Sequence, residues 1–124
     1  MTGERTQEER QEERKREYSR RERFFAYWLS RIEGVGAKRA GKLYEYAGSF
    51  EAIYHMDETK LTALSFLGEK TGRAIAAARG QLEQRREEFE GLDRQGISLL
   101  LAGEAAYPRR LKNIYDMPVW LFVK

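Results

Sequence analysis

Two stretches of the chain, LSRIEGVGAKRAGKL at residues 29–43 and LTALSFLGEKTGRAI at residues 61–75, decide the fold. When the first stretch is shifted by 32 residues (61 − 29 = 32), its apolar, glycine, lysine and small positions mostly coincide with those of the second. Self-similarity of this kind indicates a duplicated supersecondary unit. In each copy, apolar residues at helical spacing stand on both sides of a short turn that contains glycine. The sequence therefore predicts two helical hairpins.

The apolar spacing around these hairpins predicts a mostly α-helical bundle of about five helices, which forms one domain over residues 24–95. Gly48 is expected to end a helix, because glycine adopts left-handed backbone angles at little cost. Ser49 and Asp57 are expected to cap two short helices. The predicted helices cover residues 24–32, 37–47, 49–54, 57–64 and 69–95.

The N-terminal residues differ from this region in composition. Residues 4–23 contain eight Lys or Arg and seven Asp or Glu, and Tyr18 is their one large apolar residue. Such a segment can be helical, but it has no apolar face to bury. Residues 1–23 are therefore predicted to be a charged, solvated extension.

The pattern of apolar residues changes again after Gly96. Two short apolar runs, residues 97–101 and 119–123, read as strands, and a helical piece is predicted between them at 109–114. Two strands alone make a marginal sheet. We therefore expect residues 96–124 to be a linker and the first strands of a truncated α/β domain.

Composition excludes several classes of function. The 124 residues include no Cys and one His, His55, which excludes disulfides, thiol catalysis, thiolate metal sites and any site with two imidazoles. No apolar run approaches the ~20 residues of a membrane span. No paired carboxylates, Ser/His pair or metal-ligand spacing stands out, so we expect neither catalysis nor a cofactor. The net charge of +3 is too small to prove a nucleic-acid partner.

The turn of the first hairpin carries the candidate chemistry. Gly34 and Gly36 permit a sharp turn that opens directly into a helix, so free backbone N–H groups are expected to face outward at the helix N-terminus and form a phosphate seat, while Val35 also helps to fix the angle between the two helices. Lys38 and Arg39 stand beside it and can add charge-assisted contacts. A glycine pair between helices is also often a turn and nothing more, and that interpretation stays open.

The second hairpin departs from this pattern, because Phe66 replaces the first glycine and a bulky residue there blocks close approach of a phosphate. It is expected to act mainly as a structural partner, with Lys70 and Arg73 as part of a basic rim. Tyrosines could also contact nucleic acid, since their rings can stack on bases. Packing in the core is the alternative for the tyrosines at positions 44, 46 and 54.

Each copy of the repeat resembles the helix-hairpin-helix motif, a sequence-independent DNA-binding element. Two copies together resemble the compact double-hairpin domain that is often called SAM-like. The resemblance implies contacts to backbone phosphates, which position a protein on DNA without reading bases. It implies nonspecific DNA contacts by Gly34, Val35, Gly36, Lys38 and Arg39, with Lys70 and Arg73 at the rim.

The C-terminal stretch YPRRLKNIYDMPVWLFV at residues 107–123 resembles the segment that introduces the Rossmann-like domain of the DNA-processing protein A family (DprA, also called Smf). A "YP-x-x-L" stretch and a "P-x-x-L" strand carry this resemblance. Upstream, the residue pair 28–29, the turn 34–36 and the run GSFEAI at 48–53 are similar to the N-terminal domain of that family. The resemblance covers about residues 24–124.

The DprA resemblance implies a cytoplasmic bacterial protein that protects incoming single-stranded DNA during natural transformation and helps to load the recombinase. In that family, single-strand binding and dimerisation are attributed mainly to the Rossmann-like domain. The region up to residue 95 is then expected to be an accessory domain with nonspecific DNA contacts. A protein-interaction module with no direct DNA contact is the alternative. Exposed Tyr46 or Tyr54 would favour that alternative, and a clustered basic face would favour DNA.

Overall fold

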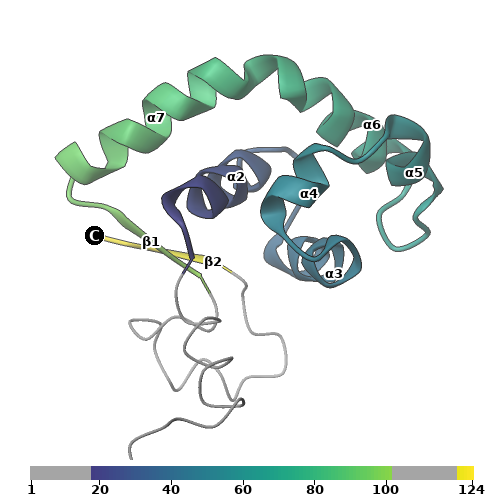
Figure 1. Cartoon of the computed structure of the whole chain (residues 1–124), viewed down its shortest axis with the longest axis horizontal. Helices are drawn as coiled ribbons and strands as arrows, with labels where there is room; N and C mark the ends of the chain where they lie inside the picture. Colours follow the sequence, from purple (N-terminus) through teal and green to yellow (C-terminus); the bar gives the residue numbers. More distant parts are fainter. Residues whose placement is uncertain (1–17, 102–119) are drawn as a thin grey trace, which may run out of the picture.

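The computed structural model describes residues 18–101 and 120–124, and this part of the chain is mostly helical, as predicted. Figure 1 shows α2 lying between α7 and α4, with α3 below α4 and with α5 and α6 at the opposite end from the two strands. The helices are α2 (Arg20–Ser30), α3 (Ala37–Ala47), α4 (Phe50–Tyr54), α5 (Glu58–Ala63), α6 (Glu69–Ala77), the 3-10 turn η1 (Ala78–Gln81) and α7 (Leu82–Arg94). The strands are β1 (Ser98–Leu101) and β2 (Trp120–Val123).

Helix α2 is the centre of the core. Its residues 24–29 are all buried, whereas a helix on the surface of a domain buries only one face. Trp28 is 0% exposed, and its indole N–H donates a hydrogen bond of 3.0 Å to the carbonyl of Ala78. A buried indole needs such a partner. The bond therefore ties α2 to the junction between α6 and η1.

The folded unit begins before the predicted boundary at residue 24. The Ser19 side chain caps α2 by accepting a hydrogen bond from the Glu22 amide, so the helix starts at Arg20. The Glu22 carboxylate in turn accepts hydrogen bonds from the amides of Phe50 and Glu51 at 2.8 and 2.9 Å. Residues 18–23 thus belong to the bundle and are not a solvated extension. Residues 1–17 lie outside the described residues.

The predicted helix over residues 69–95 is also different in the structure, because η1 divides it into α6 and α7. The carbonyl of Ala78 is bonded to the Trp28 indole, and Gly80 is a weak helix former within the break. The change of direction lets α7 lie along α2. Phe24 and Phe89 pack there with ring centroids 5.7 Å apart. Tertiary packing therefore overrides the local helix preference.

The two predicted strands are confirmed at slightly shorter bounds, and they pair with each other in antiparallel register. Leu99 and Leu101 are buried in the same core as the helices, and Arg23 of α2 donates a hydrogen bond of 2.9 Å to the Leu99 carbonyl. An antiparallel pair is not the parallel ladder of a Rossmann-like sheet, so it does not by itself establish entry into such a domain. The helix predicted at 109–114 lies outside the described residues.

The second hairpin depends on a small residue where its helices cross. A Cβ atom on Gly72 would lie 2.8 Å from both the carbonyl carbon and the carbonyl oxygen of Leu61, and 2.9 Å from the Cα of Thr62. These are all backbone atoms of α5, so they cannot rotate away. The equivalent position in the first hairpin holds Ala40, which is fully buried. The repeat thus places a small residue at both crossings.

Substitution of this glycine tests the close approach of α5 and α6. Gly72→Ala is expected to lower the free energy of unfolding by about 1–3 kcal/mol, because the added methyl group overpacks the crossing. Chemical denaturation measures this change. Gly41→Ala is the matched control, since a Cβ at Gly41 meets nothing within 4 Å. The control is expected to be neutral or to stabilise by up to about 1 kcal/mol, and equal effects of the two substitutions would contradict the account.

Candidate nucleic-acid interface

The turn of the first hairpin is built as the sequence predicts, with one difference at its centre. Gly34 has a φ of 93°, in the left-handed region that favours glycine. Val35 is 6% exposed, and its amide donates a hydrogen bond of 3.2 Å to the Ile32 carbonyl. Gly34 and Gly36 are exposed. Val35 therefore anchors the turn in the core, and the outward-facing backbone comes from the glycines.

Two backbone amides at the start of helix α3 have no hydrogen-bond acceptor in the described part of the chain. Gly36 is its N-cap residue and supplies no side-chain cap, unlike Ser19 and Ser49, which cap α2 and α4. Within residues 18–101 and 120–124, no acceptor is bonded to the amide of Gly36 or of Ala37. Helix N-termini with open amides attract anions.

The charges at this helix end reinforce the open amides. The other five α-helices in the described part of the chain carry a Glu in the first turn, and α3 has no acidic residue there. Lys38 and Arg39 take those positions instead. Acidic groups stabilise a helix N-terminus and basic groups do not, because the helix dipole is positive at that end. An external anion would resolve this unfavourable arrangement.

Arg39 also holds the two hairpins together. Its Nη1 donates a hydrogen bond of 2.8 Å to the Gly34 carbonyl and one of 3.3 Å to Oγ1 of Thr71 in α6. Positions 39 and 71 are equivalent in the repeat, since 39 + 32 = 71. The contact therefore joins equivalent positions of the two copies of the repeat.

The second turn is less open to an anion. Gly68 has a φ of 87° and forms the N-cap of α6 without a side-chain cap. However, Glu69 occupies the first turn and forms an ion pair with Arg73, so the positive charge of Arg73 is compensated. Phe66 is half-buried, and the Lys42 ammonium lies 5.9 Å from the centroid of its ring. The geometry thus gives the two hairpins unequal roles.

A comparison with protein families matches this arrangement. Residues 29–79 match the family model of the SAM-like helix-hairpin-helix tandem. The matched range begins in α2 and ends after α6, so it contains both turns and the Arg39 contact between them. No curated protein and no solved structure matches the chain.

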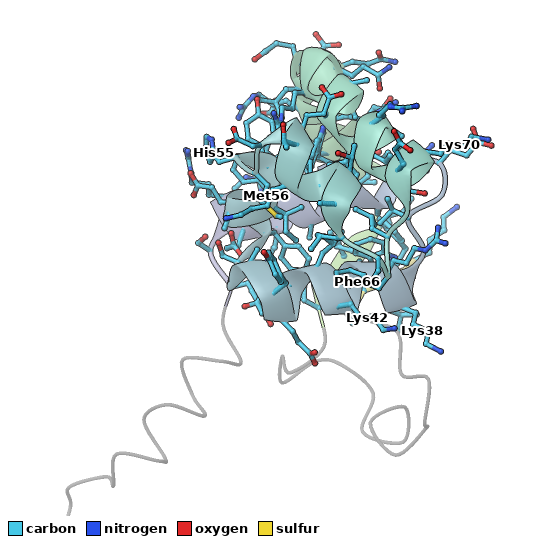
Figure 2. The ribbon with its side chains drawn as sticks, turned by 90° about the vertical axis from the view of Figure 1, so that its right-hand side faces the viewer. Lys38, Lys42, His55, Met56, Phe66 and Lys70 are labelled. Carbon is cyan, nitrogen blue, oxygen red and sulfur yellow. The ribbon has the colours of Figure 1, made fainter. Side chains whose placement is uncertain are left out.

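The tandem brings some of the predicted site residues to one side of the molecule. Figure 2 shows Lys38 and Lys70 projecting from the same side, with Lys42 and Phe66 near Lys38. Lys42 was not among the residues singled out in the sequence, although it lies one helical turn after Lys38. Arg39 and Arg73 are both engaged in contacts within the protein. Lys38, Lys42 and Lys70 add further positive charge to this face.

The tyrosines of the tandem mostly pack rather than face solvent. Tyr44 packs on Phe50 with ring centroids 4.8 Å apart, and Tyr54 packs on Trp28 with centroids 5.1 Å apart. Tyr46 is 52% exposed and is the tyrosine with a surface available for stacking in the described residues.

Neither a metal cluster nor a membrane-spanning helix finds support in residues 18–101 and 120–124. No group of three or more His, Cys, Asp or Glu could hold a metal ion there. Within the same ranges, no helix has the length and apolar character needed to cross a membrane.

The Arg39 contact gives a testable stability effect. Arg39→Ala is expected to lower the free energy of unfolding by about 1–2 kcal/mol, because the Gly34 carbonyl and the Thr71 hydroxyl lose their donor. Arg39→Lys keeps the charge and replaces the planar guanidinium, so it is expected to restore only part of the loss. Lys60→Ala, at an exposed position on α5, is the control and is expected to stay within about 0.5 kcal/mol of the parent. An unchanged denaturation midpoint for Arg39→Ala would contradict the contact.

Proposed function

We propose that the tandem binds DNA through backbone phosphates without sequence preference, with the N-terminus of α3 as the principal seat. One observation carries this proposal. α3 alone among the described α-helices lacks an acidic residue in its first turn, and it places Lys38 beside open amides in an exposed glycine turn. Local physics disfavours basic residues at that end unless an anion is bound.

The lack of sequence preference follows from the groups involved. Backbone amides and flexible ammonium groups recognise the geometry and charge of a phosphate, which is the same for every base pair. Gly34 and Gly36 have no side chain that could reach a base edge in a groove. The same groups fit a single or a double strand, so both kinds of DNA belong in the test.

The two hairpins contribute unequally to the proposed binding. The first supplies the open amides and Lys38. The second supplies Lys70, while Glu69 opposes an incoming phosphate and Phe66 occupies the place of the first glycine. Lys70 then serves as a rim contact, in line with the expectation from the sequence.

For the biological setting, we propose an accessory domain of a DNA-processing protein similar to DprA, not an enzyme, acting in the cytoplasm on incoming single-stranded DNA during natural transformation. The sequence resemblance over residues 24–124 supports this. In this proposal, recombinase loading and oligomerisation belong to a Rossmann-like domain that the chain would enter after residue 96. The tandem adds nonspecific DNA contacts to it.

A second candidate is a protein-interaction module without DNA contact. The exposed ring of Tyr46 favours it, because aromatic residues are enriched where proteins bind one another. The near balance of 23 basic and 20 acidic residues also weakens any long-range attraction to DNA. The position of Lys38 at the open end of α3 favours DNA over this alternative.

A titration of the full chain with labelled oligonucleotides tests the proposal. Fluorescence anisotropy with single-stranded and double-stranded DNA of several sequences is expected to show saturable binding that weakens as salt rises, with a log–log slope of about −0.7 to −0.9 per phosphate contact. Lys38→Gln is expected to weaken binding to every sequence alike and to make the slope shallower by about one unit.

Arg94→Gln provides the matched control, since it removes one positive charge at the last residue of α7, far from α3 and α6 in Figure 1. It is expected to leave the slope unchanged. Equal effects of Lys38→Gln and Arg94→Gln would show that binding depends only on the overall charge, and would contradict a phosphate site at the N-terminus of α3. Absence of binding to either kind of DNA at low salt would favour the protein-interaction module.

A further inference from the structure

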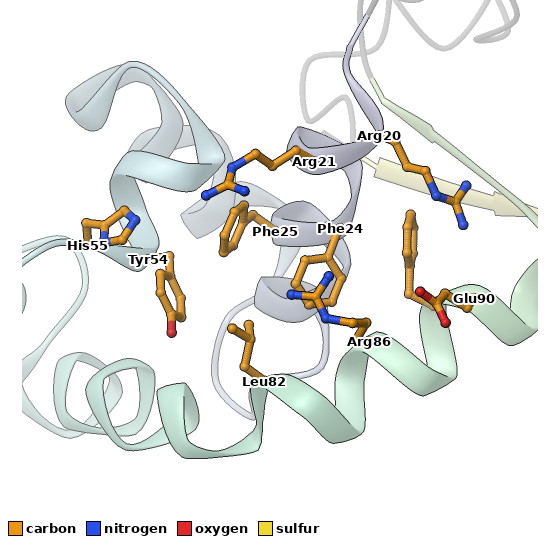
Figure 3. Close-up of a pocket in the computed structure, with 10 residues that line it drawn as sticks. Arg20, Arg21, Phe24, Phe25, Tyr54, His55, Leu82, Arg86 and Glu90 are labelled. Carbon is orange, nitrogen blue, oxygen red and sulfur yellow. The ribbon is translucent and has the colours of Figure 1, made fainter.

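A pocket of about 370 Å³ lies between α2, α4 and α7, away from the hairpin turns. Figure 3 shows Arg20, Arg21, Arg86 and His55 around it, with aromatic rings between them. Its volume falls within the range of ordinary ligand pockets. In Figure 2, His55 lies on the opposite side of the molecule from Lys38 and Lys70. An occupant of this pocket would therefore not compete for the proposed DNA-binding face.

The pocket combines an apolar floor with arginines that lie over its rings. Phe24, Phe25 and Phe89 are all buried, and a guanidinium group lies over each ring. The guanidinium carbon of Arg20 lies 5.0 Å from the Phe89 centroid, and that of Arg86 lies 4.7 Å from the Phe24 centroid. Stacking on a ring fixes the plane of a guanidinium and leaves its N–H edges pointing outward.

Two of the three arginines, Arg20 and Arg86, have guanidinium N–H groups that could donate hydrogen bonds to a ligand. Arg21 is occupied, because its Nε and Nη2 donate hydrogen bonds of 2.9 and 2.7 Å to the Glu51 carboxylate. These hydrogen bonds hold the pKa of Glu51 below its ordinary value.

Arg20 and Arg86 are held more loosely. The guanidinium of Arg20 lies 3.9 Å from the Asp93 carboxylate and that of Arg86 lies 3.7 Å from the Glu83 carboxylate, and neither guanidinium forms a hydrogen bond within the part of the chain that the structure describes. Their side chains are 63% and 47% exposed. A ligand carboxylate could replace these long contacts with bidentate hydrogen bonds.

The surroundings favour a small anion over a nucleic-acid strand. Strands bind where bases can stack on open ring faces, but the three phenylalanines are buried beneath arginines and neighbouring rings. Glu90 lines the pocket, and the partners of the arginines, Glu51, Glu83 and Asp93, surround it with further negative charge. A string of phosphates would meet this repulsion along its length, whereas a single carboxylate would meet it at one point and would bring an apolar group to the buried rings.

We propose that this pocket binds a peptide segment of a partner protein that presents a carboxylate next to an aromatic or large aliphatic side chain. The carboxylate binds Arg20 and Arg86, and the apolar group occupies the space beside Tyr54 and Leu82. The chain then joins a protein partner on one face to DNA on the other. This inference does not depend on the proposed DNA binding, since it rests on different residues.

Nuclear magnetic resonance of the isotope-labelled full chain tests the pocket with a defined probe. N-acetylphenylalanine carries both required groups, and its uncharged amide is the matched control. The acid is expected to shift the resonances of Arg20, Arg86 and Leu82 in a saturable way, with a Kd of about 1 mM for a fragment of this size. The amide is expected to bind at least about tenfold more weakly, because it lacks the charge.

Substitutions separate the pocket from nonspecific effects. Arg86→Gln and Arg20→Gln are each expected to weaken binding of the acid about tenfold while the remaining resonances keep their folded dispersion, and Lys38→Gln is expected to change nothing. Deoxyadenosine monophosphate serves as the competing probe. If it shifts the pocket resonances more strongly than the acid does, the pocket is a nucleotide site and the peptide proposal is wrong. The proposal is also overturned if the acid and its amide bind equally or if neither perturbs the pocket.

Discussion

The hydrogen bonds from Arg39 to the Gly34 carbonyl and the Thr71 hydroxyl are the constraint on which the tandem depends. They join the turn of one hairpin to the first turn of α6 in the other, between equivalent positions of the two copies. Arg39 therefore has a structural role even without a bound ligand. Lys38 and Lys70 emerge on one side of the two hairpins that this contact joins.

A comparison of two helix N-termini separates structure from function in this molecule. The amides at the start of α4 are bonded to the Ser49 hydroxyl and the Glu22 carboxylate, so that end is closed and serves the fold. The start of α3 has neither a cap nor an acid, and Lys38 adds positive charge where the helix dipole is already positive. Departures from local preference tend to mark functional positions, because stability alone would remove them.

Much of the tandem could be predicted from the repeat, since its glycines and apolar spacing encode the turns and the helix faces directly. Three features could not, because each depends on groups far apart in the chain. Trp28 fixes the break at η1 through the Ala78 carbonyl, 50 residues away. Glu22 caps a helix 28 residues later, which draws the segment from residue 18 into the bundle. Arg39 remains a predicted phosphate contact, but its hydrogen bond to Thr71, 32 residues later, was not predicted.

The central claim is that the open amides at the start of α3 receive a phosphate. The most direct measurement follows the backbone amide resonances of the full chain during titration with a short mixed-sequence DNA duplex and with the corresponding single strand. The account predicts that Gly36, Ala37 and Lys38 show the largest shifts, that Lys70 shifts less, and that all of them revert as salt is added. Unchanged amides at Gly36 and Ala37 in a chain that demonstrably binds DNA would contradict the account and place the contact elsewhere.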